Sequence, residues 1–318
     1  MISESQEPRD AGALRLAEEL AKGPAFDPRN FRLWQEHGFH ITPVHFYQPV
    51  PDTRRLKDSL WEQPPPLTGV EMNDAGQQRF LREVCLPYRG EYERWPLQAA
   101  GTPYQFHFDQ YFFRMVDAEV LYCVIRHFRP SRIVEIGSGF STFVAAEACR
   151  KNLEEGHKTL LTSIEPYPND ILRRGFPGLE ALIEAPVEEA DPAVFRSLGA
   201  NDILFIDSSH VLRIGNDVHY EYLRLIPSVS PGVFIHIHDI FLPLEYPKEW
   251  VLNEGRFWNE QYLLQAFLAF NHSFPVVWAG CYMHCKYPDL LRETFPSYDP
   301  HTTLPGSFWM RRTGGPGT

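Results

Sequence analysis

The chain has 318 residues, 43% hydrophobic and 22% charged, so it can bury a sizeable core as one large domain or two modest ones. Its 30 Lys and Arg against 41 Asp and Glu give a formal net charge of −11, which argues against nucleic acid or an anionic membrane as a partner. No apolar stretch approaches the roughly 20 residues that a membrane-spanning helix needs.

The first 110 residues are expected to form an N-terminal cap, part helical and part extended. Helices are expected at 11–22 and 73–84, while proline-rich stretches such as 43–51 cannot continue a helix or a central strand. Acidic residues near the start stand where a secretory signal needs a basic segment. The five cysteines lack paired metal-ligand spacing and are expected to be reduced thiols. We therefore expect a cytoplasmic protein.

From Tyr111 onward the sequence alternates between helical and strand patterns. A helix expected at 111–128 is followed by short runs rich in β-branched residues, and helices are expected between them at 142–151, 192–198, 216–225 and 259–270. The expected strands are 132–136, 159–165, 179–185, 203–207, 233–238, 274–279 and 306–311. This alternation predicts an α/β fold with a seven-stranded, mostly parallel sheet over residues 111–312, and residues 313–318 are expected to be a disordered tail.

The first expected strand ends in a glycine turn, Glu135-Ile-Gly137-Ser-Gly139, and a helix follows it. The two glycines allow a tight turn and a close approach of the backbone to a ligand. A dinucleotide-binding fingerprint would have a third glycine where this chain has Thr142, which argues against a nicotinamide cofactor.

An acid before this turn, with a second acid, Glu165, at the end of the next strand, resembles the class I S-adenosylmethionine-dependent methyltransferases. The resemblance implies a Rossmann-like fold and S-adenosylmethionine as cofactor. The planar carboxylate of Glu165 would accept hydrogen bonds from both ribose hydroxyls. The cofactor-binding positions that the resemblance implies are Glu135, Gly137, Ser138, Gly139, Glu165, Pro186, Val187 and Asp207.

Acids and histidines also leave the fourth and fifth expected strands, as Asp207 and His210 and as His238 and Asp239. The D-x-x-H spacing is similar to that of metal-dependent sugar and macrolide O-methyltransferases. This implies catalytic roles for His210, Asp207 and Asp239, with His210 as the base, and a divalent metal (Mg, Mn or Fe) at Asp207, His238 and Asp239. A histidine among these ligands suits Mg²⁺ poorly, because Mg²⁺ prefers oxygen ligands. The alternative is that His238 and Asp239 are a structural pair at a strand end.

His236 and His238 lie on one face of the fifth expected strand, which would also suit a nonhaem iron centre, but the alternation of helices and strands is unlike the common iron oxygenases. The leading expectation is O-methylation of a small-molecule hydroxyl, on a sugar or natural product. One alternative is a cyclase or lyase that releases methylthioadenosine from S-adenosylmethionine, similar to the azetidine-2-carboxylate-forming enzymes. Another is a non-catalytic scaffold that keeps the cofactor site. Aromatic residues in the cap suggest a homodimer.

Overall fold

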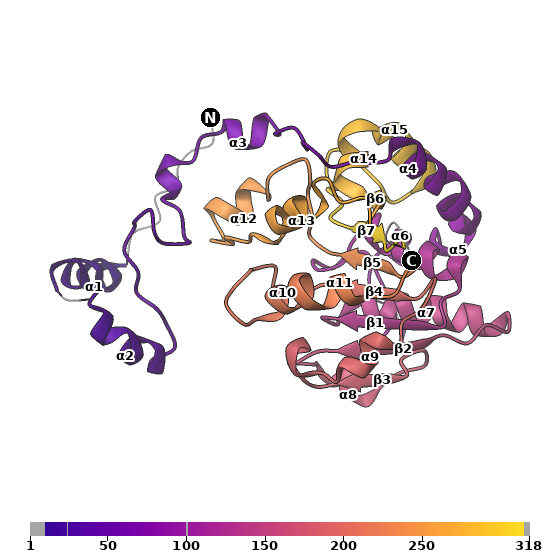
Figure 1. Cartoon of the computed structure of the whole chain (residues 1–318), viewed down its shortest axis with the longest axis horizontal. Coiled ribbons are helices and arrows are strands. Elements are labelled where there is room, and N and C mark those ends of the chain that lie inside the picture. The colour runs from indigo at the N-terminus through magenta and orange to yellow at the C-terminus, as the bar shows by residue number, and fades with distance from the viewer. Residues whose placement is uncertain (1–9, 24, 100, 315–318) are drawn as a thin grey trace. The chain divides into compact units, whose positions relative to one another are not determined.

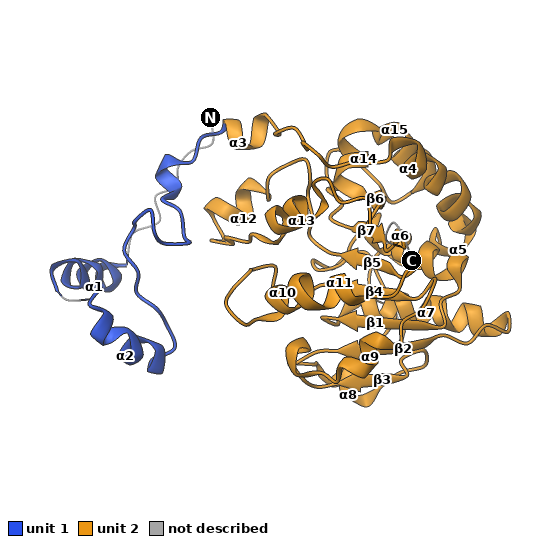
Figure 2. Ribbon diagram, in the orientation of Figure 1, with its two compact units in different colours: residues 1–58 blue, residues 59–318 orange. Residues whose placement is uncertain are grey.

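The computed structural model describes residues 10–23, 25–99 and 101–314, which form two compact units, Met1–Asp58 and Ser59–Thr318 (Figure 2). The N-terminal cap was expected to reach residue 110, whereas residues 59–99 and 101–110 belong to the larger unit. The side chain of Asn73 donates to the carbonyl of Val276, and the buried Gln77 side chain accepts from the backbone N–H of Ala279. Of the expected disordered tail, residues 315–318 lie outside the described residues.

The larger unit is built on a mostly parallel sheet of seven strands in the order β3-β2-β1-β4-β5-β7-β6 (Figure 1). Only β7 runs antiparallel to its neighbours, β5 and β6. The strands are β1 (Arg132–Ile136), β2 (Leu160–Ile164), β3 (Ala181–Ile183), β4 (Ile203–Ile206), β5 (Phe234–Ile237), β6 (Val276–Ala279) and β7 (Phe308–Arg311). Each lies within one of the seven expected ranges, so the predicted fold class is confirmed.

Helices cover both faces of the sheet (Figure 1). In the smaller unit the helices are α1 (Ala11–Lys22) and α2 (Phe31–Glu36), with 3₁₀ turns at Pro28–Asn30 and Thr53–Arg55. Those of the larger unit are α3 (Ser59–Glu62), α4 (Asp74–Phe80), α5 (Arg89–Tyr92), α6 (Asp117–Phe128), α7 (Phe140–Glu154), α8 (Asp170–Arg174), α9 (Pro192–Arg196), α10 (Asp217–Tyr220), α11 (Ile226–Ser228), α12 (Lys248–Leu252), α13 (Glu260–Leu268), α14 (Gly280–Lys286) and α15 (Pro288–Thr294). Shorter helical turns lie at Leu81–Cys85, Leu86–Tyr88, Val187–Glu189 and Glu221–Leu225.

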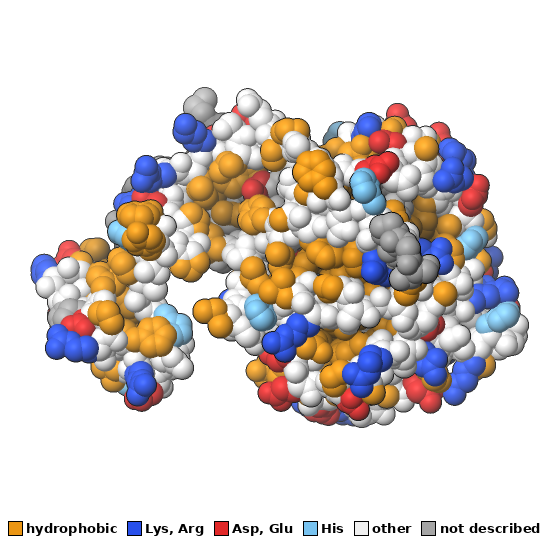
Figure 3. All heavy atoms as spheres, in the orientation of Figure 1, with side chains coloured by type: hydrophobic (Ala, Val, Ile, Leu, Met, Phe, Trp, Pro, Cys, Tyr) orange, Lys and Arg blue, Asp and Glu red, His pale blue; other side chains and the backbone are white. Residues whose placement is uncertain are grey.

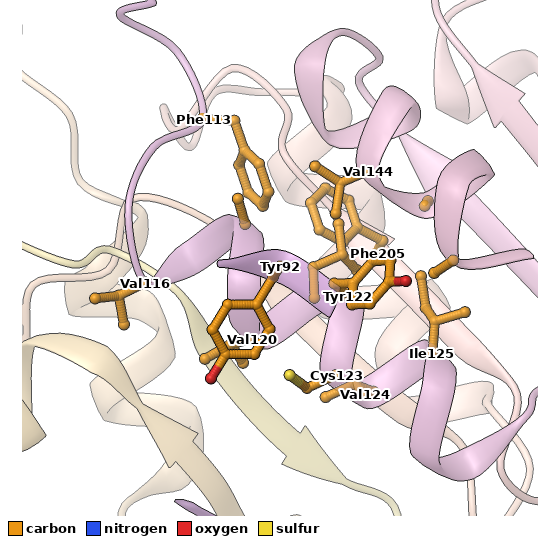
Figure 4. Close-up of a cluster of buried hydrophobic side chains, with 14 of the residues drawn as sticks. Tyr92, Phe113, Val116, Val120, Tyr122, Cys123, Val124, Ile125, Val144 and Phe205 are labelled. Atoms are coloured by element: carbon orange, nitrogen blue, oxygen red, sulfur yellow. The ribbon is translucent and has the colours of Figure 1, made fainter. Parts of the chain in front are cut away.

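Alternation along the strands divides the core into two hydrophobic clusters, one on each face of the sheet. Ile133 of β1 and Phe205 of β4 belong to the cluster that includes α6 and α7, whereas Val134 and Leu204 belong to the cluster that includes α9 and α13. Figure 4 shows part of the first cluster, where Phe205 lies among side chains of α6 and α7. This packing fixes the carboxyl ends of β1, β4 and β5, on which the candidate site is built.

The helix expected at 111–128 begins only at Asp117. Before it, the side-chain oxygen of Gln110 accepts hydrogen bonds from the backbone N–H groups of Phe112 and Phe113 and holds them in a turn. The carboxylate of Glu119 then accepts from the backbone N–H of Val116 and caps the helix. Residues 111–116 are therefore a loop, and Tyr111 is free to line a cavity.

The smaller unit exposes large apolar side chains (Figure 3). Phe46 and Tyr47 are 82% and 81% exposed, and Val44 is 67% exposed. Among the described residues of this unit only Ala25 is a buried hydrophobic residue. In the described part of the chain, no helix combines the length and the apolar character needed to cross a membrane.

Candidate active site

The glycine turn after β1 contacts the end of β4. Gly137 has φ of +76°, and a Cβ atom there would lie 1.8 Å from the backbone oxygen of Asp207. The backbone N–H of Asp207 in turn donates to the carbonyl of Ile136 over 2.9 Å. Glycine is therefore required at position 137 by both conformation and space. This contact places the Asp207 side chain beside the turn.

A cavity of about 390 Å³ lies over the ends of β1, β2 and β4. Five of the eight predicted cofactor-binding residues line it: Gly137, Glu165, Pro186, Val187 and Asp207. The carboxylate of Glu165 accepts hydrogen bonds from the backbone N–H groups of Ser138 (3.1 Å) and Tyr167 (2.8 Å), which fix its position. Each oxygen keeps a second lone pair for a ligand hydroxyl, so the site fits the ribose of S-adenosylmethionine.

The other three predicted cofactor-binding residues, Glu135, Ser138 and Gly139, do not line this cavity. Glu135 is buried beneath the turn, where its carboxylate accepts hydrogen bonds from the hydroxyls of Ser141 (2.8 Å) and Ser163 (2.6 Å). Burial raises its pKa to about 7. Glu135 thus ties β1 to β2 and to α7. Ser138 holds Glu165 through its backbone N–H, and the backbone N–H of Gly139 donates to the hydroxyl of Thr142.

A second cavity, of about 610 Å³, shares Asp207, Ser208 and Ser209 with the first. Asp217 holds the shared wall in place, because its carboxylate accepts hydrogen bonds from both the backbone N–H and the hydroxyl of Ser209. Two ligands bound in the two cavities would meet at this wall. The structure thus brings together one cavity shaped by the glycine turn and one lined by the predicted catalytic residues Asp207, His210 and Asp239.

His210 is buried between three carboxylates. Its Nδ1 atom lies 2.9 Å from Glu260, and its Nε2 atom lies 3.3 Å from Asp207 and 3.7 Å from Asp239. The backbone is held as well, because the His210 carbonyl accepts the N–H groups of Asn259 and Glu260 at the start of α13. Nδ1 is thereby anchored, and Nε2 is the ring nitrogen that faces the two acids of the cavity wall.

The charges of this cluster determine the pKa of His210 and therefore its protonation state. Burial lowers the pKa of His210, but hydrogen bonds to Asp207 and Glu260 outweigh it and raise the pKa well above its ordinary value. Burial raises the pKa of Asp207, yet His238 and His210 lower it overall. His210 is therefore an imidazolium beside an ionised Asp207 at neutral pH. His210 can therefore take a proton from a bound hydroxyl group only after it has lost one of the two protons on its ring nitrogens.

His238 and Asp239 lie at the end of β5, with Nε2 of His238 3.6 Å from Asp239. Burial raises the pKa of Asp239, against the opposing effect of His238 and His210. Burial lowers the pKa of His238, but Asp239, Asp207 and Asp117 outweigh it and raise the pKa. Asp117, which the sequence analysis missed, opens α6 and accepts the backbone N–H groups of Gly306 and Ser307 over 2.9 Å each.

His236 shares a face of β5 with His238, as predicted, and the two rings are stacked with centroids 5.8 Å apart. His236 is fully buried, however, with its ring stacked on Phe205 and its Nε2 3.2 Å from the hydroxyl of Ser307. Burial lowers its pKa well below the ordinary value. His236 is thus a neutral residue of the core and does not line either cavity.

Asp207, His238 and Asp239, which were expected to bind a divalent metal, are not arranged to bind one. Nε2 of His210 lies between Asp207 and Asp239, so a protonated imidazole supplies the positive charge that a metal would bring. Over residues 10–23, 25–99 and 101–314, no group of three or more His, Cys, Asp or Glu side chains is arranged to hold a metal ion. We therefore assign no step to a metal.

The rest of the second cavity is aromatic and cationic, and its arginines, Arg256 and Arg114, were not among the predicted site residues. The guanidinium of Arg256 lies over the rings of Trp250, Trp258 and Tyr111, at 4.7, 5.2 and 5.6 Å from their centroids. Trp258 also contacts the ring of His210, with centroids 4.4 Å apart. The available signal was the density of aromatic residues around an arginine at positions 250–258. Tyr111 and Phe112 line this cavity, whereas the nearby Phe106 and Phe108 are buried against Trp95.

Comparisons with known proteins agree with this geometry. A family model described as "Methyltransferase domain" matches residues 134–240, from β1 to the end of β5. An uncharacterized protein of Archaeoglobus fulgidus is 32% identical over 176 residues, which cover 53% of this chain and 78% of that protein. The chain belongs to the class I S-adenosylmethionine-dependent methyltransferases.

Solved structures similar to this methyltransferase include the plantazolicin methyltransferase BamL, in complex with a desmethylPZN analogue and SAH. It is 14% identical, covers 60% of this chain and 83% of its own, and has a TM-score of 0.37. The apo structure of CmcI-N160 is also 14% identical, covers 88% of this chain and 100% of its own, and has a TM-score of 0.37. At these identities and TM-scores the likenesses do not extend to substrates or site residues.

Proposed function

We propose that this methyltransferase methylates a hydroxyl group of a small-molecule acceptor, such as a sugar or natural product. The observation that carries the proposal is the shared wall at 207–209. At this wall the first cavity, which is lined by the predicted cofactor-binding residues and which we call the cofactor-side cavity, meets the second cavity, which is lined by His210, Asp207 and Asp239. When bound, S-adenosylmethionine supplies an electrophilic methyl group on a sulfonium. An acceptor hydroxyl in the second cavity can approach that methyl group from the far side of the wall.

The chain's own residues receive the proton of the hydroxyl. Asp207 is ionised and lines both cavities, and its carboxylate lies 3.3 Å from Nε2 of His210, so it positions that nitrogen beside the place where the two ligands would meet. His210, in its neutral form, takes the proton at Nε2, while Glu260 holds Nδ1. The imidazolium that results is stabilised by the same three carboxylates that raise the pKa of His210.

The test is to incubate the purified protein with S-adenosylmethionine, first alone and then with pooled hydroxylated metabolites, and to quantify adenosylhomocysteine and methylthioadenosine by mass spectrometry. Acceptor-dependent adenosylhomocysteine, with a product heavier by one methylene, is the expected result. Methylthioadenosine formed without acceptor would instead make the cofactor itself the substrate, as in the cyclase or lyase alternative. Parallel reactions with a chelator test the metal prediction, and we expect turnover to be unchanged.

The sequence-based expectations about partners remain part of the proposal. The net charge of −11 favours a small molecule over nucleic acid. The exposed apolar side chains of the smaller unit, such as Phe46 and Tyr47, favour a homodimer. Light scattering coupled to size-exclusion chromatography tests this, and a monomer at all concentrations would contradict it.

A further inference from the structure

The wall of the second cavity carries positive charge as well as acids. Arg256 lines the cavity, and its guanidinium is held by three aromatic rings and by an ion pair with Glu254 at 2.7 Å. One further contact, from Nη2 to the hydroxyl of Tyr111, is 3.4 Å long. A guanidinium has five N–H donors, and both of these polar contacts use Nη2. Among the described residues, the donors on Nε and Nη1 have no hydrogen-bond partner, so they are left for a ligand.

A second guanidinium, that of Arg114, lines the same cavity. Within the described ranges, no side chain forms an ion pair or a hydrogen bond with it. Two arginines around one cavity, one of them stacked on aromatic rings, are a typical arrangement for binding a carboxylate or phosphate. In a chain with a net charge of −11, such a local positive wall also keeps an anionic ligand from being repelled.

The position of Arg256 relative to the reaction centre limits the size of the ligand. Trp258 contacts both groups, since its ring centroid lies 5.2 Å from the Arg256 guanidinium and 4.4 Å from the centroid of the His210 ring. Arg256 and His210 thus share Trp258 as a neighbour and line the same cavity, so one small ligand can reach both. Trp250 and Phe241 extend the apolar surface of the same wall.

We propose that the acceptor carries an oxyanion, a carboxylate or a phosphate, which binds Arg256 while the hydroxyl to be methylated lies at His210. The scaffold between these groups is small and lies against Trp250 and Trp258. This inference rests on the proposed function and adds the class of acceptor to it. Arg256 acts as a specificity-determining residue, and Arg114 contributes a second, more exposed positive charge.

The experiment measures binding of matched probes by saturation-transfer NMR, with adenosylhomocysteine present. The probes are glucose 6-phosphate with glucose, and 4-hydroxyphenylacetate with its neutral amide. The proteins are the wild type, Arg256→Gln, Arg256→Lys and the control Arg292→Gln, which removes an arginine of α15 that pairs with Asp289 outside the cavity. Affinity for adenosylhomocysteine is measured separately for every variant.

In the wild type and in Arg292→Gln, each anion should bind about 10-fold more tightly than its neutral partner. Arg256→Gln should remove this preference and Arg256→Lys should keep part of it, because lysine retains the charge but not the planar fork. Equal binding of anion and neutral partner, a preference that survives in Arg256→Gln, or no binding of either anion at about 10 mM would overturn the proposal. If the anion proposal fails in this way while the protein still binds and converts the cofactor, the proposed methyltransferase function stands. A wild-type protein that neither binds nor converts the cofactor would contradict the proposed methyltransferase function instead.

Discussion

The Nδ1 atom of His210 lies 2.9 Å from Oε2 of Glu260, a fully buried carboxylate at the start of α13. The same helix start donates two backbone N–H groups to the carbonyl of His210. Ring and backbone of His210 are therefore fixed by one element. This directs Nε2 toward Asp207 and Asp239, and it makes the proton affinity of His210 depend on Glu260.

Replacing Glu260 with Gln should shift the pH dependence of catalysis. Loss of this charge lowers the pKa of His210, so the neutral imidazole becomes available at lower pH and the rising limb of kcat against pH moves toward acid. We also expect the plateau of kcat to fall about 10-fold, because a neutral amide holds Nδ1 less strongly than the carboxylate does. NMR titration of the imidazole in wild type and variant checks the assignment. An unchanged titration would show that Glu260 does not control the proton on His210.

The variant His210→Ala should separate catalysis from cofactor binding. His210 lines the second cavity and not the cofactor-side cavity, so affinity for S-adenosylmethionine should stay nearly intact. Turnover should fall about 10²- to 10⁴-fold, the usual loss when a general base is removed. Calorimetric titration with the cofactor and steady-state assays measure the two quantities. An equal loss of both would refute the base assignment.

Gly137→Ala should destabilise the protein strongly. The new Cβ would overlap the backbone oxygen of Asp207 in a conformation with positive φ, so we expect a loss of about 3 kcal/mol or more in the free energy of unfolding. The control is Gly90→Ala in α5, where a Cβ meets nothing within 4 Å and where alanine favours the helix. Urea denaturation compares them. Similar stability of the two variants would mean that the turn relaxes freely.

Glu135 should make the stability of the protein depend on pH near neutrality. Burial raises its pKa to about 7 in the native state, against 4.5 as the ordinary value, so the native state binds the proton more tightly than the unfolded chain does. The stabilisation is present below pH 4.5 and is lost as pH rises through 7, a change of about 3 kcal/mol. Glu135→Gln cannot ionise, so its stability relative to wild type should increase over this pH range. A constant difference between the two urea midpoints would contradict the shifted pKa.

The sequence predicted the sheet well because local patterns determine it. All seven strands lie within their expected ranges, and parallel strands necessarily bring Glu165, Asp207 and Asp239 to one edge. The start of α6 was misplaced because Gln110, a single side chain before the helix, holds the preceding backbone in a turn. The packing of residues 59–99 and 101–110 within the larger unit depends on specific polar contacts, such as those of Gln77, that no periodicity reveals.

The parts of the site that were missed come from segments whose position depends on tertiary packing. Asp117 can be identified as a site residue only from the packing of α6 against the segment before β7. Glu260 can be identified only because α13 begins next to His210. Arg256 belongs to a connection between β5 and α13 that has no periodic pattern of its own. Sequence patterns locate residues along strands, but they do not tell which side chains from distant connections converge on a strand end.

The two cavities draw their walls from different parts of the chain. The shared wall at 207–209 directly follows β4, whereas Phe241, Pro247, Trp250, Arg256 and Trp258 come from the connection between β5 and α13. The segments around Arg114 and Leu304 complete the second cavity. Part of the wall of the second cavity is thus encoded apart from the glycine turn and Glu165. Replacing residues 241–258 with a different sequence would alter which acceptor is methylated while leaving the glycine turn and Glu165 in place. The architecture therefore allows the range of acceptors to diversify, in nature or by directed evolution, through a segment that lies apart from the glycine turn and Glu165.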